Sequence, residues 1–303
     1  MNVHFENVNL SSTSGPNHFA GKILRYLQSL DVTFQQDRFP DARLCFIESY
    51  RGNFDEVPLV QRLDGIYFNS SQDYLLQNTN IQRTYNNANG VVFQSDFNRK
   101  LITKYFGGHK SYRVIHNGAD VEYISQVEPI QGDILDKYDT LWCCAASWRP
   151  HKRLNENIRY FLEHAGEKDC LIVAGQITED PIINDRVYYV GNIGVHDLTS
   201  IYKRSKYFLH LAWLDHCPNV VVDARAAGCT VICTSAGGTK EIAGPDSIII
   251  EEEEWDFNPV ELYKPPVLNF ENKVNNVWNK LDDVGMHGVA KKYKKFLTEI
   301  VSQ

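Results

Sequence analysis

The sequence lacks the features that mark membrane, secreted and nucleic-acid-binding proteins. No apolar run among its 303 residues reaches the roughly 20 residues that a membrane helix needs. The opening residues, Met-Asn-Val-His-Phe-Glu, contain no cationic segment followed by an apolar one. The net charge of −7 argues against broad affinity for nucleic acid. We therefore expect a cytoplasmic protein with no transmembrane segment, no signal peptide and no nucleic-acid partner.

Cysteine is present, but not in the pattern of a disulfide framework or a metal site. The seven cysteines are odd in number and irregularly spaced, and five fall in apolar runs. This pattern favours free thiols in a reducing compartment. No Cys/His spacing matches a structural zinc site, so we expect no metal ligands among the cysteines.

Length and periodicity predict two domains of the α/β class. A chain of 303 residues exceeds what one hydrophobic core usually serves, and its 43% hydrophobic content is ordinary for a globular protein. Strand and helix patterns alternate over residues 3–115 and again over 140–250, which predicts two parallel, helix-covered sheets. The strands expected in the first set are Val3–Leu10, Val32–Gln35, Arg43–Ile47, Val57–Leu63, Gly90–Gln94 and Tyr112–Ile115.

The remaining segments are predicted from weaker patterns. Residues 121–138 are polar and contain proline and glycine, which suits a linker. A short helix is expected over residues 239–243, and two helices with a break near Gly285 over residues 272–301. The acidic run 251–254 is interpreted as a solvated strand end.

Residues 215–228 combine two acids with a helix start. Asp215 precedes the predicted helix, Asp223 lies within it, and Pro218 suits its first turn. The backbone amides of Asn219 and Val220 at the helix start favour an anion. Carboxylates accept hydrogen bonds from sugar hydroxyls, so this stretch could bind a molecule with both phosphates and hydroxyls. In the alternative interpretation, Asp215 simply caps the helix.

Three further places carry candidate ligand-binding groups. Residues 147–153 place three cations, Arg149, Lys152 and Arg153, between a strand and a helix, where they could neutralise a diphosphate or simply lie on the surface. The loop around Gly15 joins a strand to a helix and could cradle a phosphate or form an ordinary turn. Asp64 ends a strand at the carboxyl edge, where open α/β sheets bind ligands.

The order of these motifs resembles that of family 4 glycosyltransferases (glycosyl transferases group 1). Residues 115–120, Ile-His-Asn-Gly-Ala-Asp, resemble the Asn-Gly-Val-Asp signature that closes the family's first domain. Residues 148–152 resemble its Arg-x-x-Pro-x-Lys loop, and Asp215 to Asp223 resembles its Glu-x7-Glu motif. The resemblance covers most of residues 112–245 in unbroken order, with further matches at residues 172–175, 189–191, 226–232 and 237–241.

The resemblance implies an α/β fold of the GT-B type, in which two Rossmann-like, doubly wound domains face a cleft. A shortened acceptor-side domain would span residues 1–118 and be joined by the last helix, about 286–303. The domain that binds the nucleotide-sugar donor would span residues 119–285. The implied activity is retaining, metal-independent transfer of a sugar from a nucleoside diphosphate to an acceptor hydroxyl, with no cofactor.

The resemblance also implies roles for single residues, and this chain departs from the family at several of them. Lys152 would stabilise the departing diphosphate, Asp215 would contact the donor sugar and Asp223 the ribose, although the family has glutamate at both acidic positions. Ser147 stands where the family has arginine, so Arg149 becomes a substitute cation, and Asp64 stands where many members have histidine. The other implied donor-binding residues are Gly15, Gly191, Asn192, Ile193, Pro218, Asn219 and Val220.

Two other functions remain open from the sequence. The two glutamate-to-aspartate changes and the shortened first domain are also compatible with a GT-B shell that binds a nucleotide or glycan without turnover. A sugar-nucleotide epimerase or a phosphorylase would keep the fold and change the chemistry. The leading hypothesis is a glycosyltransferase for polysaccharide or glycan synthesis whose donor carries UDP or GDP.

Overall fold

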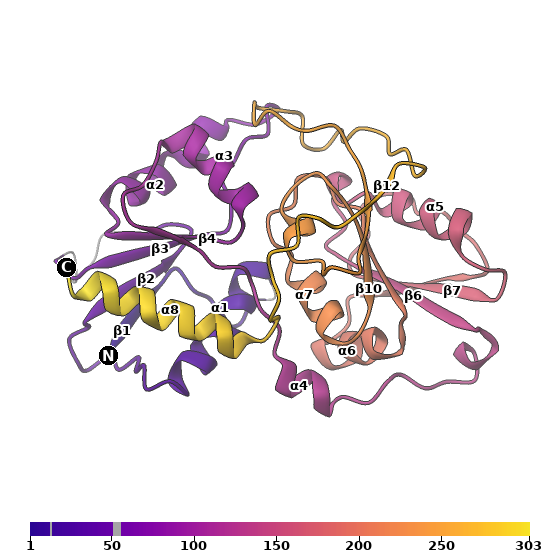
Figure 1. Ribbon diagram of the computed structural model, residues 1–303, viewed down its shortest axis with the longest axis horizontal. Coiled ribbons are helices and arrows are strands. Elements are labelled where there is room, and N and C mark those ends of the chain that lie inside the picture. The colour runs from indigo at the N-terminus through magenta and orange to yellow at the C-terminus, as the bar shows by residue number, and fades with distance from the viewer. Residues whose placement is uncertain (13, 51–55) are drawn as a thin grey trace. The chain divides into compact units, whose positions relative to one another are not determined.

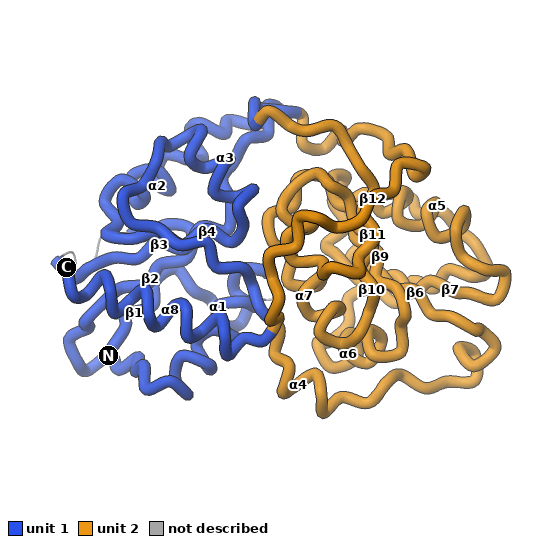
Figure 2. Tube along the Cα trace, in the orientation of Figure 1, with its two compact units in different colours: residues 1–118, 257–260, 285–303 blue, residues 119–256, 261–284 orange. Residues whose placement is uncertain are grey.

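The computed structural model describes residues 1–12, 14–50 and 56–303, which divide into two compact units. Unit 1 comprises residues 1–118, 257–260 and 285–303, and unit 2 comprises residues 119–256 and 261–284 (Figure 2). Residues 257–260, expected in the second domain, pack with unit 1 because Val260 forms a parallel bridge with Asn69. Among the described residues, no helix is long and apolar enough to cross a membrane.

The sheet of unit 1 is parallel and its strands lie in chain order. Its strands are β1 (Val3–Glu6), β2 (Ala42–Phe46), β3 (Leu59–Leu63), β4 (Gly90–Phe93) and β5 (Tyr112–Val114). The strand expected over residues 32–35 is reduced to a single bridge between Asn2 and Thr33. The prediction of a longer strand is wrong because the Asn2 side chain bonds the backbone of Gln35 and Arg38, replacing strand pairing.

Helices cover both faces of this sheet (Figure 1). Helices α1 (Gly15–Gln28) and α8 (Met286–Val301) share one hydrophobic core with inward side chains of β1 to β4. Helices α2 (Tyr74–Asn87) and α3 (Asp96–Phe106) lie on the other face, where Gln61 of β3 donates to the Ile81 carbonyl of α2. Tyr293 and Phe296 of α8 are buried, as their helical spacing predicted.

The sheet of unit 2 has six parallel strands and one antiparallel edge strand. Its spatial order is β12-β11-β10-β9-β6-β7-β8. These strands are β6 (Thr140–Ala145), β7 (Asp169–Ala174), β8 (Val187–Gly191), β9 (Tyr207–His210), β10 (Thr230–Thr234), β11 (Ile248–Ile250) and β12 (Lys273–Asn275). Strands β7 and β8 lie on one side of β6, whereas β9, β10 and β11 lie on the other, so the order of the strands switches between β6 and β9. Open α/β sheets bind ligands at the carboxyl ends beside such a switch point.

The two faces of this sheet have separate cores because side chains alternate along each strand. Leu141 and Cys143 of β6 pack with α6 (Val195–Arg204) and α7 (Asn219–Ala226), whereas Trp142 and Cys144 pack with α5 (Leu154–His164). Unit 2 is therefore doubly wound, as the alternating pattern predicted. All seven cysteines are buried free thiols.

Three segments of unit 2 differ from the prediction. The expected linker contains helix α4 (Val121–Gln126), which Asp120 caps by accepting a hydrogen bond from the Tyr123 amide. Only a 3₁₀ turn, Thr239–Glu241, forms over residues 239–243. The first of the two helices expected over 272–301 is also wrong, since β12 and irregular backbone occupy residues 273–284.

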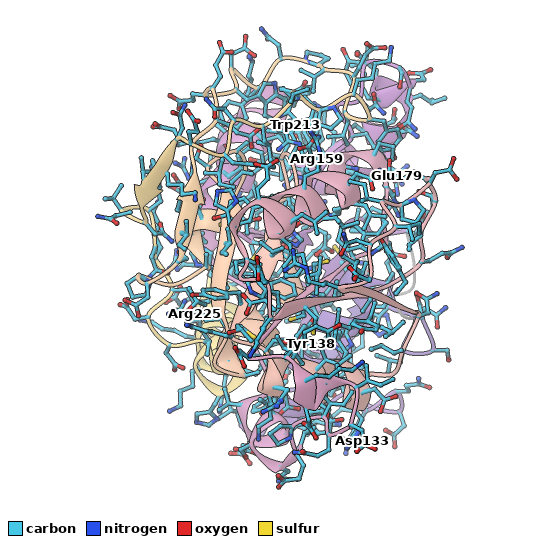
Figure 3. The ribbon with its side chains drawn as sticks, turned by 90° about the vertical axis from the view of Figure 1, so that its right-hand side faces the viewer. Asp133, Tyr138, Arg159, Glu179, Trp213 and Arg225 are labelled. Carbon is cyan, nitrogen blue, oxygen red and sulfur yellow. The ribbon has the colours of Figure 1, made fainter. Side chains whose placement is uncertain are left out.

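The segment after β12 stays irregular because side chains from elsewhere bond its backbone. Arg225 of α7, labelled in Figure 3, donates to the carbonyls of Leu281 (2.6 Å) and Ile242 (3.0 Å). Asn276 in turn donates to the carbonyls of Lys240 and Gly244. The bond to Leu281, together with the bond from the Lys280 amide to the Glu241 carbonyl (2.8 Å), engages backbone groups that a helix would use. The other bonds attach the segment to residues 240–244 of unit 2.

Candidate functional site

Lys152 and Asp215, predicted as functional from separate motifs, meet in unit 2. The Lys152 Nζ lies 2.5 Å from Asp215 Oδ2, and the two side chains are 19% and 14% exposed. Lys152 ends a 3₁₀ turn, Pro150–Lys152, that follows β6, and Asp215 follows β9. Since β6 and β9 are neighbours at the switch point, the ion pair lies at the edge where such sheets bind ligands.

Hydrogen bonds from the Asn157 side chain and from the backbone fix the Lys152 loop to the segment after β9. Asn157 of α5 donates to the carbonyls of Lys152 (3.1 Å) and Arg153 (2.7 Å) and accepts from the Leu211 amide (3.1 Å). The Trp213 amide donates to the His151 carbonyl at 2.8 Å. These bonds run from one loop to the other, so the ion pair is held by its surroundings before any ligand arrives.

Asp215 is also anchored by groups that its motif did not predict. Its Oδ2 lies 2.8 Å from Nε2 of His210, the last residue of β9, and its Oδ1 accepts from the His216 amide at 3.0 Å. Its backbone bridges Gly237, which has φ of +96°. A Cβ on Gly237 would lie 2.6 Å from the Asp215 carbonyl oxygen, so only glycine allows this approach.

The capping interpretation of Asp215 is wrong. Helix α7 has Pro218 as its N-cap, so Pro218 precedes the helix and does not occupy its first turn. The Asp215 carboxylate instead contacts Lys152, His210 and the His216 amide.

Charge and burial set the protonation of this cluster. Burial alone would raise the pKa of Asp215, but the Lys152 ammonium and the hydrogen bond from His210 outweigh it and hold that pKa well below its usual range. Burial lowers the pKa of His210, although Asp215 opposes this shift. At neutral pH the cluster therefore holds an ionised carboxylate beside a neutral imidazole, whose Nε2–H donates to the carboxylate.

Arg153 faces the protein interior and not a diphosphate. Its guanidinium contacts both oxygens of Glu252, at 2.7 and 3.1 Å, and the carbonyls of Leu211 and Pro266. The side chains of Arg153 and Glu252 are 1% and 8% exposed. The interpretation of three phosphate-binding cations is therefore wrong for Arg153, and Glu252 is not a solvated member of the acidic run.

The other predicted residues of unit 2 lie along the same chain segments. Ser147 and Arg149 are exposed in the loop after β6, and Gly191 and Asn192 are exposed at the end of β8. Asp223 is half-buried in α7; besides burial, its charge helps to raise the pKa of Tyr202 in α6. The remaining donor-binding candidates, all half-buried, are Ile193, Pro218, Asn219 and Val220.

In unit 1, Asp64 belongs to a buried polar network. Arg62 forms an ion pair with Asp64 through Nη1 and donates to Asn117 Oδ1 through Nη2 at 2.7 Å. Gln94 also donates to Asp64 Oδ1, at 3.1 Å. Gly15 is the exposed first residue of α1, and its loop includes Thr13, which lies outside the described residues. The network thus joins Asp64 to Asn117 of the predicted signature.

Sequence reasoning missed His210, Asn157 and Arg62. Each is a polar residue, at most 4% exposed, within or beside an apolar segment. His210 interrupts the apolar run of residues 208–212 at the carboxyl end of its strand. A polar residue at that position is the signal that could have identified it.

The buried histidines make stability fall in acid. Burial lowers the pKa of His151 to about 3 and that of His216 to about 4, and the pKa of His210 is also lowered. Because the unfolded chain takes up protons near its ordinary pKa of about 6.5, the stability that these neutral groups contribute is lost as pH falls below that value. Between pH 7.5 and 5.5 we expect unit 2 to lose about 1 kcal/mol of stability for His151 and about the same for His216.

Tryptophan fluorescence during urea unfolding measures this loss, because all five tryptophans belong to unit 2. In the variant His151→Phe, which retains a ring beside Tyr263, the pH dependence should shrink by about one bound proton. A urea midpoint that does not change between pH 7.5 and 5.5 would refute the prediction.

Known proteins share the fold of this chain. Residues 141–256 match the family model described as glycosyl transferases group 1. A comparison with curated proteins finds no match. Anabaena HepE in complex with UDP and glucose has a TM-score of 0.64 at 13% identity, covering 99% of this chain and 100% of that one. Sucrose-phosphate synthase from Thermosynechococcus elongatus has a TM-score of 0.66 at 10% identity, covering 100% and 99%.

AviGT4, a glycosyltransferase involved in avilamycin A biosynthesis, has a TM-score of 0.60 at 12% identity and covers 100% of this chain and 98% of that one. At such identities the structural likeness establishes the fold. The family match includes both Lys152 and Asp215. We conclude that this chain has the GT-B fold and that its residues 141–256 carry the resemblance to glycosyl transferases group 1 that its motifs predicted.

Proposed function

We propose that the protein is a glycosyltransferase that moves a sugar from a nucleoside diphosphate to an acceptor hydroxyl. The observation that carries this proposal is the Lys152–Asp215 ion pair at the switch point of unit 2, inside the segment that matches the family. A sugar diphosphate has anionic phosphates at one end, which a cation stabilises, and sugar hydroxyls at the other, which donate hydrogen bonds to a carboxylate. The UDP and glucose of the HepE complex favour a UDP-sugar as the first donor to test.

The proposed mechanism uses the charges of the site in place of a metal ion. The Lys152 ammonium has three donors, of which one contacts Asp215, so two can bind the departing diphosphate. Arg149 adds a second, exposed cation in the same loop. Asp215 accepts a hydrogen bond from a hydroxyl of the donor sugar, and Asp223 accepts hydrogen bonds from the ribose hydroxyls. Gly191, Asn192 and Ile193 lie beside the base.

Finer parts of the proposal come from the resemblance alone. These are transfer with retention of configuration, a role in polysaccharide or glycan synthesis, and the parts that Gly15 and Asp64 of unit 1 play at the diphosphate and the acceptor. Product stereochemistry by NMR tests retention. It also distinguishes transfer from the chemistry of an epimerase or a phosphorylase.

The direct test is incubation with a panel of UDP-, GDP-, ADP- and dTDP-sugars, with nucleotide release and donor binding measured together. We expect one donor class to bind and to release its nucleotide faster when an acceptor is present. If no member of the panel binds, the proposal is wrong.

A binding module without turnover is the second candidate function. The observation that favours it is that Asp215, one methylene shorter than the family's glutamate, already contacts both Lys152 and His210. Calorimetric binding of a donor without hydrolysis or transfer across a broad acceptor library would support this candidate. Transfer that disappears in Lys152→Ala would reject it.

Replacing Asp223 by alanine should chiefly weaken donor binding. A hydrogen bond to a charged group contributes about 1.5 kcal/mol or more, so the Kd for the donor should rise by about tenfold while kcat at saturating donor changes little. Calorimetry gives the Kd. The matched control is Asp136→Ala, because Asp136 is 58% exposed and pairs with Arg204 at 3.6 Å on the surface. Equal Kd values for Asp223→Ala and the wild type would contradict the proposed ribose contact.

A further inference from the structure

The Asp215 carboxylate has little hydrogen-bonding capacity left. Its Oδ2 contacts both the Lys152 Nζ, at 2.5 Å, and the His210 Nε2, at 2.8 Å, and its Oδ1 accepts from the His216 amide at 3.0 Å. A carboxylate offers about four acceptor positions, two on each oxygen. Three of them are occupied, so one position on Oδ1 remains for a ligand.

Lys152 and His210 differ in how firmly they can hold this carboxylate. The lysine ammonium stands on a flexible four-carbon stem and can turn toward a phosphate. His210 belongs to strand β9, is 4% exposed, and its ring lies nearly parallel to that of Phe208, at an interplanar angle of 12°. While one Lys152 donor stays on Asp215 and the other two engage a diphosphate, His210 is the rigid side chain that keeps Asp215 in place.

The protonation state suits this task. The groups that act on the His210 ring are the Asp215 carboxylate and the Lys152 ammonium, and burial lowers the pKa of the ring. The imidazole is therefore neutral at pH 7, and because its Nε2 faces a carboxylate, that nitrogen carries the proton. A neutral donor of this kind anchors the carboxylate without neutralising the charge that a sugar hydroxyl would meet.

We propose that His210 is a positioning residue that fixes Asp215 so that its Oδ1 accepts a single hydroxyl of the donor sugar. The inference rests on the proposed glycosyl transfer and adds a residue to it. It also explains how an aspartate can serve where the family has glutamate. The shorter side chain is held by a fixed histidine, and the one acceptor position that remains selects a hydroxyl at one place on the sugar.

The test compares His210→Phe, which keeps a ring beside Phe208 but removes the donor, with His210→Gln, which restores an N–H donor. With the donor sugar that the wild-type protein uses, we expect His210→Phe to lower kcat by about tenfold or more, the loss of one hydrogen bond to a charged group, with a smaller change in KM. His210→Gln should recover most of that loss. His164→Gln is the matched control, since Nδ1 of His164 in α5 bonds the Tyr160 carbonyl of the same helix, at 2.9 Å.

A double-mutant cycle separates positioning from a general loss of structure. Combined with Asp215→Asn, the His210→Phe change should cost little more activity, because the carboxylate that His210 positions is already gone. Additive losses, equal losses in the Phe and Gln variants, or full activity in His210→Phe would each overturn the inference while leaving the proposed function intact. Absence of turnover in the wild-type protein would instead overturn the proposed function and, with it, this inference.

Discussion

Replacing Lys152 by alanine is expected to lower kcat for sugar transfer by about 100- to 1,000-fold. Removing one preorganised electrostatic contact to a developing charge costs about 2.7–4 kcal/mol in enzymes that act this way. Lys152 is suited to that task because its loop is fixed by Asn157 and because one ammonium donor holds it beside Asp215. Steady-state kinetics with the donor found in the panel gives kcat and KM separately.

Stability and an exposed lysine provide the controls for this variant. Asp215, 14% exposed, keeps His210 and the His216 amide when Lys152 is removed, so we expect unfolding to become easier by about 1.5–3 kcal/mol, the loss of one hydrogen bond to a charged group. Lys168→Ala, at an exposed lysine in the same unit, should leave kcat unchanged. If Lys152→Ala instead unfolds at the temperature of the assay, so that the loss of activity follows the loss of folded protein, the lysine is structural and the proposed role is wrong.

The partners of Lys152 show where sequence reasoning stops. Motif order predicted both Lys152 and Asp215, because spacing along a family pattern survives in the sequence. That the two residues pair, and share an oxygen with His210, depends on β6 and β9 being neighbours. β6 ends at Ala145 and β9 begins at Tyr207, with 61 residues between them, so no local pattern contains this contact.

The same reason separates the elements predicted correctly from those that were not. Strands and amphipathic helices such as α8 follow from periodicity, because one face of each is buried. Residues 273–284 also show an apolar helical spacing, but β12 pairs with β11 at the start of this segment. Arg225 then donates to the Leu281 carbonyl, and Asn276 donates to the Lys240 carbonyl. Such tertiary hydrogen bonds override a local pattern and leave no mark on it.

Arg153, the neighbour of Lys152, should show the opposite behaviour: its loss should destabilise the fold and leave the chemistry of the folded protein unchanged. Arg153→Met removes one partner of a buried ion pair and leaves the Glu252 carboxylate, 8% exposed, without its cation. Breaking such a pair typically costs about 3–5 kcal/mol. We therefore expect the urea midpoint of unit 2, measured by tryptophan fluorescence, to fall sharply, with an unchanged Kd for the donor under conditions where the variant is folded.

Two further variants make the prediction specific. Arg159→Ala, in α5 (labelled in Figure 3), also removes an arginine from an ion pair. The Arg159 side chain is 45% exposed, so its loss should change stability by less than about 1 kcal/mol. Arg153→Met combined with Glu252→Gln should recover part of the lost stability, because the uncompensated charge is removed. Lost turnover with unchanged stability in Arg153→Met would mean that the side chain reaches the diphosphate after all. The expected result instead assigns the adjacent cations Lys152 and Arg153 to catalysis and to folding respectively, because one lies at the ligand-binding edge of the sheet and the other is buried against Glu252.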